Sequence, residues 1–172
     1  MPAGEERAIV LADASVLVNL AIVDRLDLLG SLPGFRFRVP EDVVAEVQRQ
    51  RDLLDRAFEA GHLEPVSLTG IAVLAHFASL RRQLGAGEAA CLALAHERGW
   101  SVASDERRWF RREARRLLGE DRLLTTPDLF RLAIRHDYWT VSDADEAKEI
   151  LERNRFRMRF ASFRDPMRRH GG

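Results

Sequence analysis

At 172 residues, 46% of them apolar and 31% charged, the chain has the length and composition of one globular domain, which excludes an intrinsically disordered protein. Its one cysteine, Cys91, excludes an internal disulfide and predicts a reducing compartment. The apolar run 8–12 is too short for a signal peptide or a membrane span, so we expect a cytoplasmic protein with no membrane partner.

The net charge is zero, but the charges are unevenly distributed along the chain. Residues 1–100 carry 10 Arg against 14 acidic residues, and residues 101–172 carry 16 Arg and Lys148 against 13 acidic residues. This polarity predicts an acidic pocket together with a basic surface that attracts nucleic acid. A coding preference for arginine explains the composition equally well.

Strand-like and helical segments alternate along the chain, which is typical of parallel strands joined by helical crossovers. The apolar periodicity predicts strands at 8–12, 35–39, 63–68, 100–104 and 122–124, and helices at 15–29, 40–61, 71–84, 86–98, 106–118, 127–136 and 143–153. No repeat or low-complexity linker divides these segments. The pattern therefore predicts an α/β fold with a central, mostly parallel sheet of four to five strands flanked by helices.

Two aspartates directly follow predicted strands. Asp13 comes after the strand at 8–12, and Asp105 comes after the strand at 100–104. The carboxyl edge of a parallel sheet is where such folds bind their ligands, and the two side chains would face each other if these strands were neighbours. For Asp13 alone, capping of the following helix is an equally good explanation.

Two glutamates lie in apolar helical segments. Glu46 is spaced to face the buried stripe of its predicted helix, although a long side chain that reaches water is an alternative. Glu88 lies in the first turn of an almost wholly apolar helix, where the helix dipole also favours an acid. Carboxylates brought together repel one another, and a cation is one way to keep them ionised. Ligands that are all oxygens favour Mg²⁺ or Mn²⁺ over zinc.

The four acidic segments occur in a recognisable order. They are Leu11-Ala12-Asp13-Ala14-Ser15, Val44-Ala45-Glu46-Val47, Gly87-Glu88-Ala89-Ala90 and Ala103-Ser104-Asp105-Glu106. This ordered set resembles the acidic motifs of PIN domains, which include VapC-like toxins, metal-dependent ribonucleases that pair with an antitoxin. The third motif differs, because those toxins usually carry aspartate there. Glu88 is instead similar to a PIN-like branch with a Gly-Glu-Ala motif.

The resemblance implies a PIN-like three-layer fold and a metal-dependent endoribonuclease that hydrolyses RNA phosphodiester bonds, as a candidate toxin of a toxin-antitoxin pair. We expect Asp13 and Asp105 to be direct ligands of Mg²⁺ or Mn²⁺, with Glu46 and Glu88 completing the catalytic site. Ser15, Asn19, Ser104 and Thr125 are candidates for orienting water or phosphate. An antitoxin and a second copy of the chain are the expected protein partners. The alternative is a PIN-like nucleic-acid-binding module with weak or no cleavage.

We expect residues 1–136 to form the catalytic domain and residues 137–172 to form a helical and basic extension of it. Arginines that follow Asp105 are candidates for binding RNA phosphates: Arg107, Arg108, Arg111 and Arg112, with Arg115 and Arg116 beyond them. A solvated helix face that pairs with Glu113 and Glu120 is the alternative. In the segment 155–160, arginines alternate with apolar residues, which predicts an extended segment with a docked apolar side.

Other nucleotide-binding and metal-binding motifs are not supported. The Gly-Ala-Gly-Glu-Ala-Ala segment at 85–90 matches a dinucleotide-binding loop in letters, but a helix rather than a strand precedes it. No phosphate-binding loop with Gly-Lys-Ser/Thr occurs. The five histidines are scattered without ligand spacing, which indicates ordinary core or surface residues: His62, His76, His96, His136 and His170.

Overall fold

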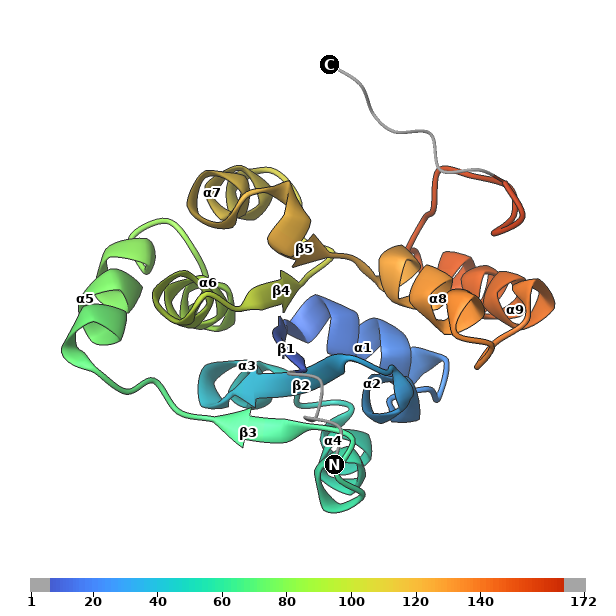
Figure 1. Cartoon of the computed structure of the whole chain (residues 1–172), viewed down its shortest axis with the longest axis horizontal. Helices are drawn as coiled ribbons and strands as arrows, with labels where there is room; N and C mark the ends of the chain where they lie inside the picture. The colour runs from blue at the N-terminus through green and yellow to red at the C-terminus, as the bar shows by residue number, and fades with distance from the viewer. Residues whose placement is uncertain (1–6, 166–172) are drawn as a thin grey trace, which may run out of the picture.

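The computed structural model describes residues 7–165, and their centre is a sheet of five parallel strands in the order β3-β2-β1-β4-β5 (Figure 1). The strands are β1 (Ala8–Ala12), β2 (Phe35–Pro40), β3 (Glu64–Val66), β4 (Ser101–Ala103) and β5 (Leu123–Leu124). The α/β prediction is confirmed, and within the described residues the sheet is wholly parallel. The apolar strand β1 occupies the middle, as expected for a strand that is covered on both faces.

Helices cover both faces of this sheet and make the three-layer arrangement. They are α1 (Ala14–Ile22), α2 (Asp27–Ser31), α3 (Glu41–Glu46), α4 (Arg51–Glu59), α5 (Ile71–Leu80), α6 (Ala86–Arg98), α7 (Trp109–Leu118), α8 (Thr126–Arg135) and α9 (Val141–Arg153), with a 3₁₀ turn at Glu120–Arg122. In Figure 1, α5, α6 and α7 lie to the left of the sheet, and α1, α2, α8 and α9 lie to the right. None of the helices in the described part of the chain is long and apolar enough to cross a membrane.

Four of the predicted helices differ from the observed ones by three residues or more, and one of them, the predicted helix 71–84, ends at Leu80. The predicted helix 15–29 is divided into α1 and α2, with Asp24 at a φ of 54° between them. The predicted helix 40–61 is divided into α3 and α4: both pack against α1, but α3 packs mainly against α6. The predicted helix 106–118 begins three residues later, at Trp109, after Arg108 at a φ of 53°. These breaks follow from the tertiary packing, which local periodicity does not show.

Helix α6 is the most buried helix, as its composition of small and apolar residues predicts. Its residues 89–95 are at most 1% exposed, and it packs against β1, β2 and β4. Cys91 is fully buried there, and burial raises the pKa of its thiol well above the ordinary range, with nearby carboxylates adding to the effect. The helix ends at Gly99, which adopts the left-handed conformation that glycine favours.

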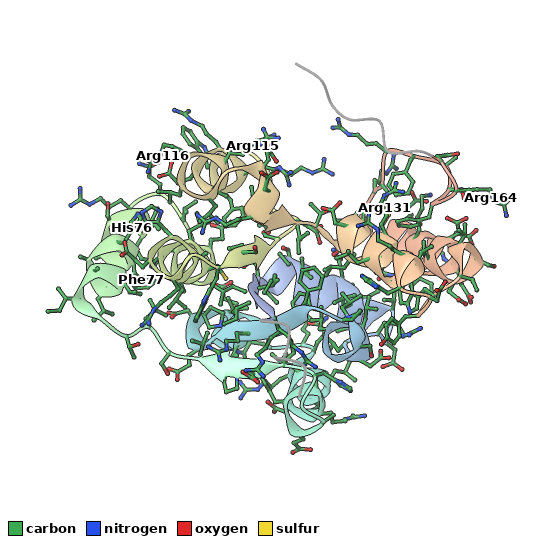
Figure 2. The ribbon with its side chains drawn as sticks, viewed as in Figure 1. His76, Phe77, Arg115, Arg116, Arg131 and Arg164 are labelled. Atoms are coloured by element: carbon green, nitrogen blue, oxygen red, sulfur yellow. The ribbon has the colours of Figure 1, made fainter. Side chains whose placement is uncertain are left out.

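The segment after α9 confirms the predicted alternation of apolar and basic side chains. Met158 is buried, Phe156 and Phe160 are partly buried, and the three arginines between and before them are exposed. The segment is irregular rather than a strand, and its apolar side packs on the same chain. The Arg131 guanidinium lies 4.9 Å from the centre of the Phe160 ring. Figure 2 shows Arg131 on α8. The division into a catalytic domain, 1–136, and an extension, 137–172, remains a prediction. Residues 1–6 and 166–172, which include His170, lie outside the described residues.

Candidate metal-binding and catalytic site

Asp13 lies at the carboxyl edge of the sheet, directly after β1. Strand β4 is the neighbour of β1, as expected, and the Asp13 backbone N–H donates to the carbonyl oxygen of Ala103 at 3.0 Å. The Asp13 side chain is only 2% exposed. Its Oδ2 accepts hydrogen bonds from the hydroxyls of Ser104 at 2.9 Å and Ser15 at 3.1 Å. Two strand ends therefore meet at one carboxylate.

The second oxygen of this carboxylate has no hydrogen-bond partner. Oδ1 of Asp13 is buried, and although Asp13 occupies the N-cap position of α1, its side chain accepts no capping hydrogen bond. Burial raises the pKa of Asp13, and the hydroxyls of Ser104 and Ser15, together with the backbone N–H groups of Ala14 and Ser15, offset this only in part. Because these two N–H groups nevertheless lower the pKa of this carboxyl, helix capping remains an alternative role for Asp13. A buried carboxylate with an unpaired oxygen is costly, and a bound cation would relieve that cost.

Glu46 and Glu88 approach each other around two glycines. The backbone N–H of Gly87 donates to Oε1 of Glu46 at 2.8 Å, and that of Gly85 donates to Oε2 of Glu88 at 2.9 Å. A Cβ on Gly87 would lie 2.9 Å from Oε2 of Glu46, so a larger residue there would displace the Glu46 carboxylate. The spacing of Glu46 turns it toward the buried stripe, but its side chain is exposed, which agrees with the alternative of a long side chain that reaches water. Helix α3 ends there, and the carboxylate reaches across to α6.

The electrostatics connect Glu88 with the other acids. Partial burial raises the pKa of Glu88 most, and the negative charges of Asp13 and Glu46 raise it further. The hydrogen bond from Gly85 acts in the opposite direction and also gives Glu88 a structural role at the start of α6. Asp13, Glu46 and Glu88 thus share one electrostatic neighbourhood beside the end of β1.

Asp105 follows β4, but its carboxylate is fully engaged in hydrogen bonds. Oδ1 accepts from the backbone N–H of Thr126 at 2.8 Å, and Oδ2 accepts from the Asn19 amide at 2.9 Å and from the Thr126 hydroxyl. Burial raises the pKa of Asp105 even though these donors lower it. Thr126, rather than the expected Thr125, contacts the site, because Thr125 caps α8 with Asp128.

Sequence reasoning missed Glu106 as a site residue. Its side chain is exposed, yet its pKa is raised, first by partial loss of hydration and then by the charges of Asp13, Glu88, Asp105 and Glu46. Its backbone N–H donates to Oγ of Ser104 at 3.2 Å, which holds the residue in a turn. The signal in the sequence was its position directly after Asp105, but the periodicity assigned it to the following helix.

The acids surround a common edge without converging on one point. Among the described residues, no three of the acids Asp13, Glu46, Glu88, Asp105 and Glu106 are close enough together to form a ready-made metal-binding group. Asp13, Glu46 and Glu88 influence one another electrostatically. Asp105 instead contacts Asn19 and Thr126. The negative charges of these four acids all act on Glu106.

A cleft of about 640 Å³ opens beside Asp105 and Glu106, and basic side chains line its other wall. The lining residues are Ala14, Ser15, Val18, Asn19, Asp105, Glu106, Arg107, Arg155, Phe156 and Arg157. Of the arginines that the sequence proposed for RNA, Arg107 is the one that lines this cleft. Arg155 and Arg157 come from the segment after α9, and their position here could not be read from the sequence.

The arginines of α7 are mostly engaged within the protein. Arg111 and Arg115 pair with Glu120, and Arg116 pairs with Glu113, as the solvated-face alternative predicted. The guanidinium of Arg112 lies 5.5 Å from the centre of the exposed Trp109 ring. Figure 2 shows Arg115 and Arg116 on the outer side of α7. Exposed ion pairs of this kind contribute little to stability.

The order and placement of these acids can now be compared with known proteins. A family model described as PIN domain matches residues 9–119, which is more than half of the chain and includes all five acids. The chain belongs to the PIN-domain family. No curated protein matches this PIN domain. A similar solved chain is found in VapBC2 from Rickettsia felis bound to a DNA fragment from its promoter, with 14% identity, coverage of 68% of this chain and 96% of that chain, and a TM-score of 0.47.

Proposed function

We propose that this PIN domain is a metal-dependent endoribonuclease that hydrolyses RNA phosphodiester bonds at the carboxyl edge of its sheet. The observation that carries the proposal is the buried, unpartnered Oδ1 of Asp13, which lies among acids whose pKa values are raised. A carboxylate in this situation is stable as an anion only if a positive charge is brought to it. Perturbed acids that gather at one edge of a sheet are also typical of functional sites.

The residues fit a hard divalent cation. The available ligands are carboxylate oxygens, whereas His76 and His96 lie elsewhere. Cys91 is near the acids, but its raised pKa disfavours the thiolate that would bind a metal. This set of ligands favours Mg²⁺ or Mn²⁺. We assign Asp13 and Asp105 as direct ligands, and Glu46 and Glu88 as residues that complete the site directly or through water. Bound there, the cation would supply Lewis acidity, which activates water and stabilises charge on the leaving oxygen.

The remaining side chains orient these groups and the substrate. Ser15 and Ser104 fix one oxygen of Asp13, so that the other is directed away from both hydroxyls. Glu106 is exposed and has a raised pKa, which suits a residue that accepts a proton from water. Arg107, Arg155 and Arg157 bind the RNA phosphates across the cleft, with Arg108, Arg111 and Arg112 extending the basic surface.

A second function, a nucleic-acid-binding module without cleavage, is favoured by one observation. Both oxygens of Asp105 are satisfied by Asn19 and Thr126, and no three of the described acids are close enough together to form a ready-made metal-binding group. A site that stays in this arrangement would bind RNA through its arginines but would hold a cation weakly. The two functions therefore differ in whether a divalent cation causes the protein to cleave the RNA that it binds.

The assay that separates them incubates the purified protein with tRNA, rRNA and single-stranded DNA, in Mg²⁺ or Mn²⁺ and in chelator. We expect cleavage of an RNA that requires the divalent cation and stops in chelator. Binding to RNA without cleavage in either metal would support the binding module and contradict the nuclease.

Roles as a cytoplasmic toxin, with an antitoxin or a second copy as partner, belong to the same proposal. Co-purification with the product of a neighbouring reading frame tests the antitoxin.

The cleft arginines provide a separate prediction. We expect the double variant Arg155→Ala, Arg157→Ala to weaken RNA binding roughly tenfold in low salt, because each lost phosphate contact removes favourable electrostatic free energy. Arg115→Ala, Arg116→Ala removes the same charge from the outer side of α7, where both side chains are already paired with acids. This matched control should change binding less than threefold. Fluorescence anisotropy with a labelled RNA measures both, and equal losses would contradict a cleft-centred RNA path.

A further inference from the structure

Two of the histidines that are scattered in the sequence meet in the structure. His76 of α5 lies beside His96 and Glu97 near the end of α6, and one ligand atom from each of the three lies within 4.8 Å of the others. The two imidazole rings are 4.8 Å apart between centres and nearly perpendicular, and Nδ1 of His76 is 3.4 Å from Oε1 of Glu97. Figure 2 shows His76 on α5. The sequence had indicated ordinary histidines, because the three residues come from two helices with no ligand spacing.

A contact with α7 already orients one of these rings. Nδ1 of His96 lies 3.3 Å from the carbonyl oxygen of Leu117. A carbonyl oxygen can only accept a hydrogen bond, so this contact favours the tautomer with its proton on Nδ1. Nε2 then keeps its lone pair for a ligand. Histidines that bind metals typically donate their other ring N–H to such an acceptor.

The chemistry of this cluster differs from that of the acidic site. Two imidazole nitrogens and one carboxylate oxygen suit Zn²⁺, whereas the acids at the sheet edge offer only oxygens. Glu88 and His96 are eight residues apart on α6, which corresponds to roughly 12 Å along the helix axis. The two sites would therefore bind different cations at opposite ends of one helix.

Helix α5 gives this cluster a structural purpose. His76 is the one titratable residue of this helix, and only Val73 and Leu80 of its ten residues are buried. Ile71 is 89% exposed and Leu74 is 50% exposed. Helix α5 packs along α6, but only two of its side chains are buried, so a ligand that bridges the two helices would strengthen the attachment.

We propose that His76, His96 and Glu97 form a Zn²⁺ site that fastens α5 to α6. The site uses none of the acids at the sheet edge, so it stands whether or not the protein cleaves RNA. Three protein ligands leave a further position for water, which is common for zinc bound by two histidines and a glutamate.

The test uses tag-free, full-length protein that has been freed of metal by chelator and then kept in excess Mg²⁺, which competes for the acidic site. Zinc is titrated against a chromophoric zinc indicator. We expect one zinc site, with affinity at least tenfold weaker in His76→Asn and in His96→Asn. His136→Asn replaces an exposed histidine outside the cluster and should bind zinc as the wild type does. Equal zinc affinity in all four proteins would overturn the site.

A second measurement tests the link between the helices. Zinc should raise the melting temperature of the wild type by several degrees and slow amide hydrogen exchange in α5. Neither effect should occur in His76→Asn, whose melting temperature in chelator should match that of the wild type and so report an intact fold. Zinc binding with unchanged exchange in α5 would overturn the proposed fastening of this helix.

Discussion

Asp13→Asn should lower RNA cleavage at least about 100-fold and at the same time stabilise the metal-free protein. The loss of cleavage is expected because the variant removes a charge that holds the cation, and single electrostatic groups of this kind are worth about 100- to 1000-fold. The gain in stability is expected because the wild-type carboxylate is buried with one oxygen unpartnered. Removal of that charge should add about 1 kcal/mol or more to the free energy of unfolding.

The stability effect has a pH dependence with a defined sign. The folded-state pKa of Asp13 is raised above its ordinary value, so the folded protein holds this proton more tightly than the unfolded chain. Stability therefore falls as the pH rises from about 4 through the raised pKa, and Asp13→Asn lacks this contribution. In chelator, the melting temperatures of the two proteins should be closest at low pH and should diverge above about pH 4.

Thermal melts across this pH range, with and without Mn²⁺, measure the effect. A difference of about 1 kcal/mol corresponds to roughly 2–4 °C for a chain of this size. Mn²⁺ should raise the melting temperature of the wild type more than that of the variant. A variant that is less stable than the wild type at neutral pH in chelator would contradict the assignment of Asp13 as a strained, unpaired anion.

Asp105→Ala should have the opposite effect on stability and cost roughly 2–4 kcal/mol of the free energy of unfolding. The Asp105 carboxylate accepts from the amide of Asn19 and from both the N–H and the hydroxyl of Thr126. Thr126 is fully buried and Asn19 is 7% exposed, so these donors would lose their acceptor in a place that water hardly reaches. Hydrogen bonds to a charged group are worth about 1.5–3 kcal/mol each, and they do not add fully.

Urea unfolding of Asp105→Ala, Thr126→Val and the double variant measures this network. If the hydrogen bonds are real, the double variant should be less destabilised than the sum of the two single variants by about 1 kcal/mol. Additive losses would contradict the network. Asp105 joins the end of β4 to the start of α8. If its variants lose cleavage, the loss therefore has two causes, the missing metal ligand and the disturbed fold. Asp13→Asn is therefore the cleaner test of the metal.

The two aspartates also explain how one family fold can support either proposed function. Oδ1 of Asp13 is buried without a hydrogen-bond partner, whereas both oxygens of Asp105 accept hydrogen bonds from the protein. For a cation to bind both aspartates, at least one of the hydrogen bonds that Asn19 and Thr126 donate to Asp105 must break. The balance between these hydrogen bonds and metal coordination decides between a nuclease and a binding module.

The sequence alone determined the parallel α/β architecture, the bounds of β1 and α6, and the position of Asp13 and Asp105 at strand ends. These features depend on local periodicity and on direct adjacency in the chain, so they need no knowledge of distant contacts. Only the tertiary structure decided where the long predicted helices break, that Glu106 belongs with the acids, and that Arg155 lines the cleft beside it. It also decided that His76 meets His96. Each of these depends on which surfaces pack together across many residues, and that packing overrides local propensity.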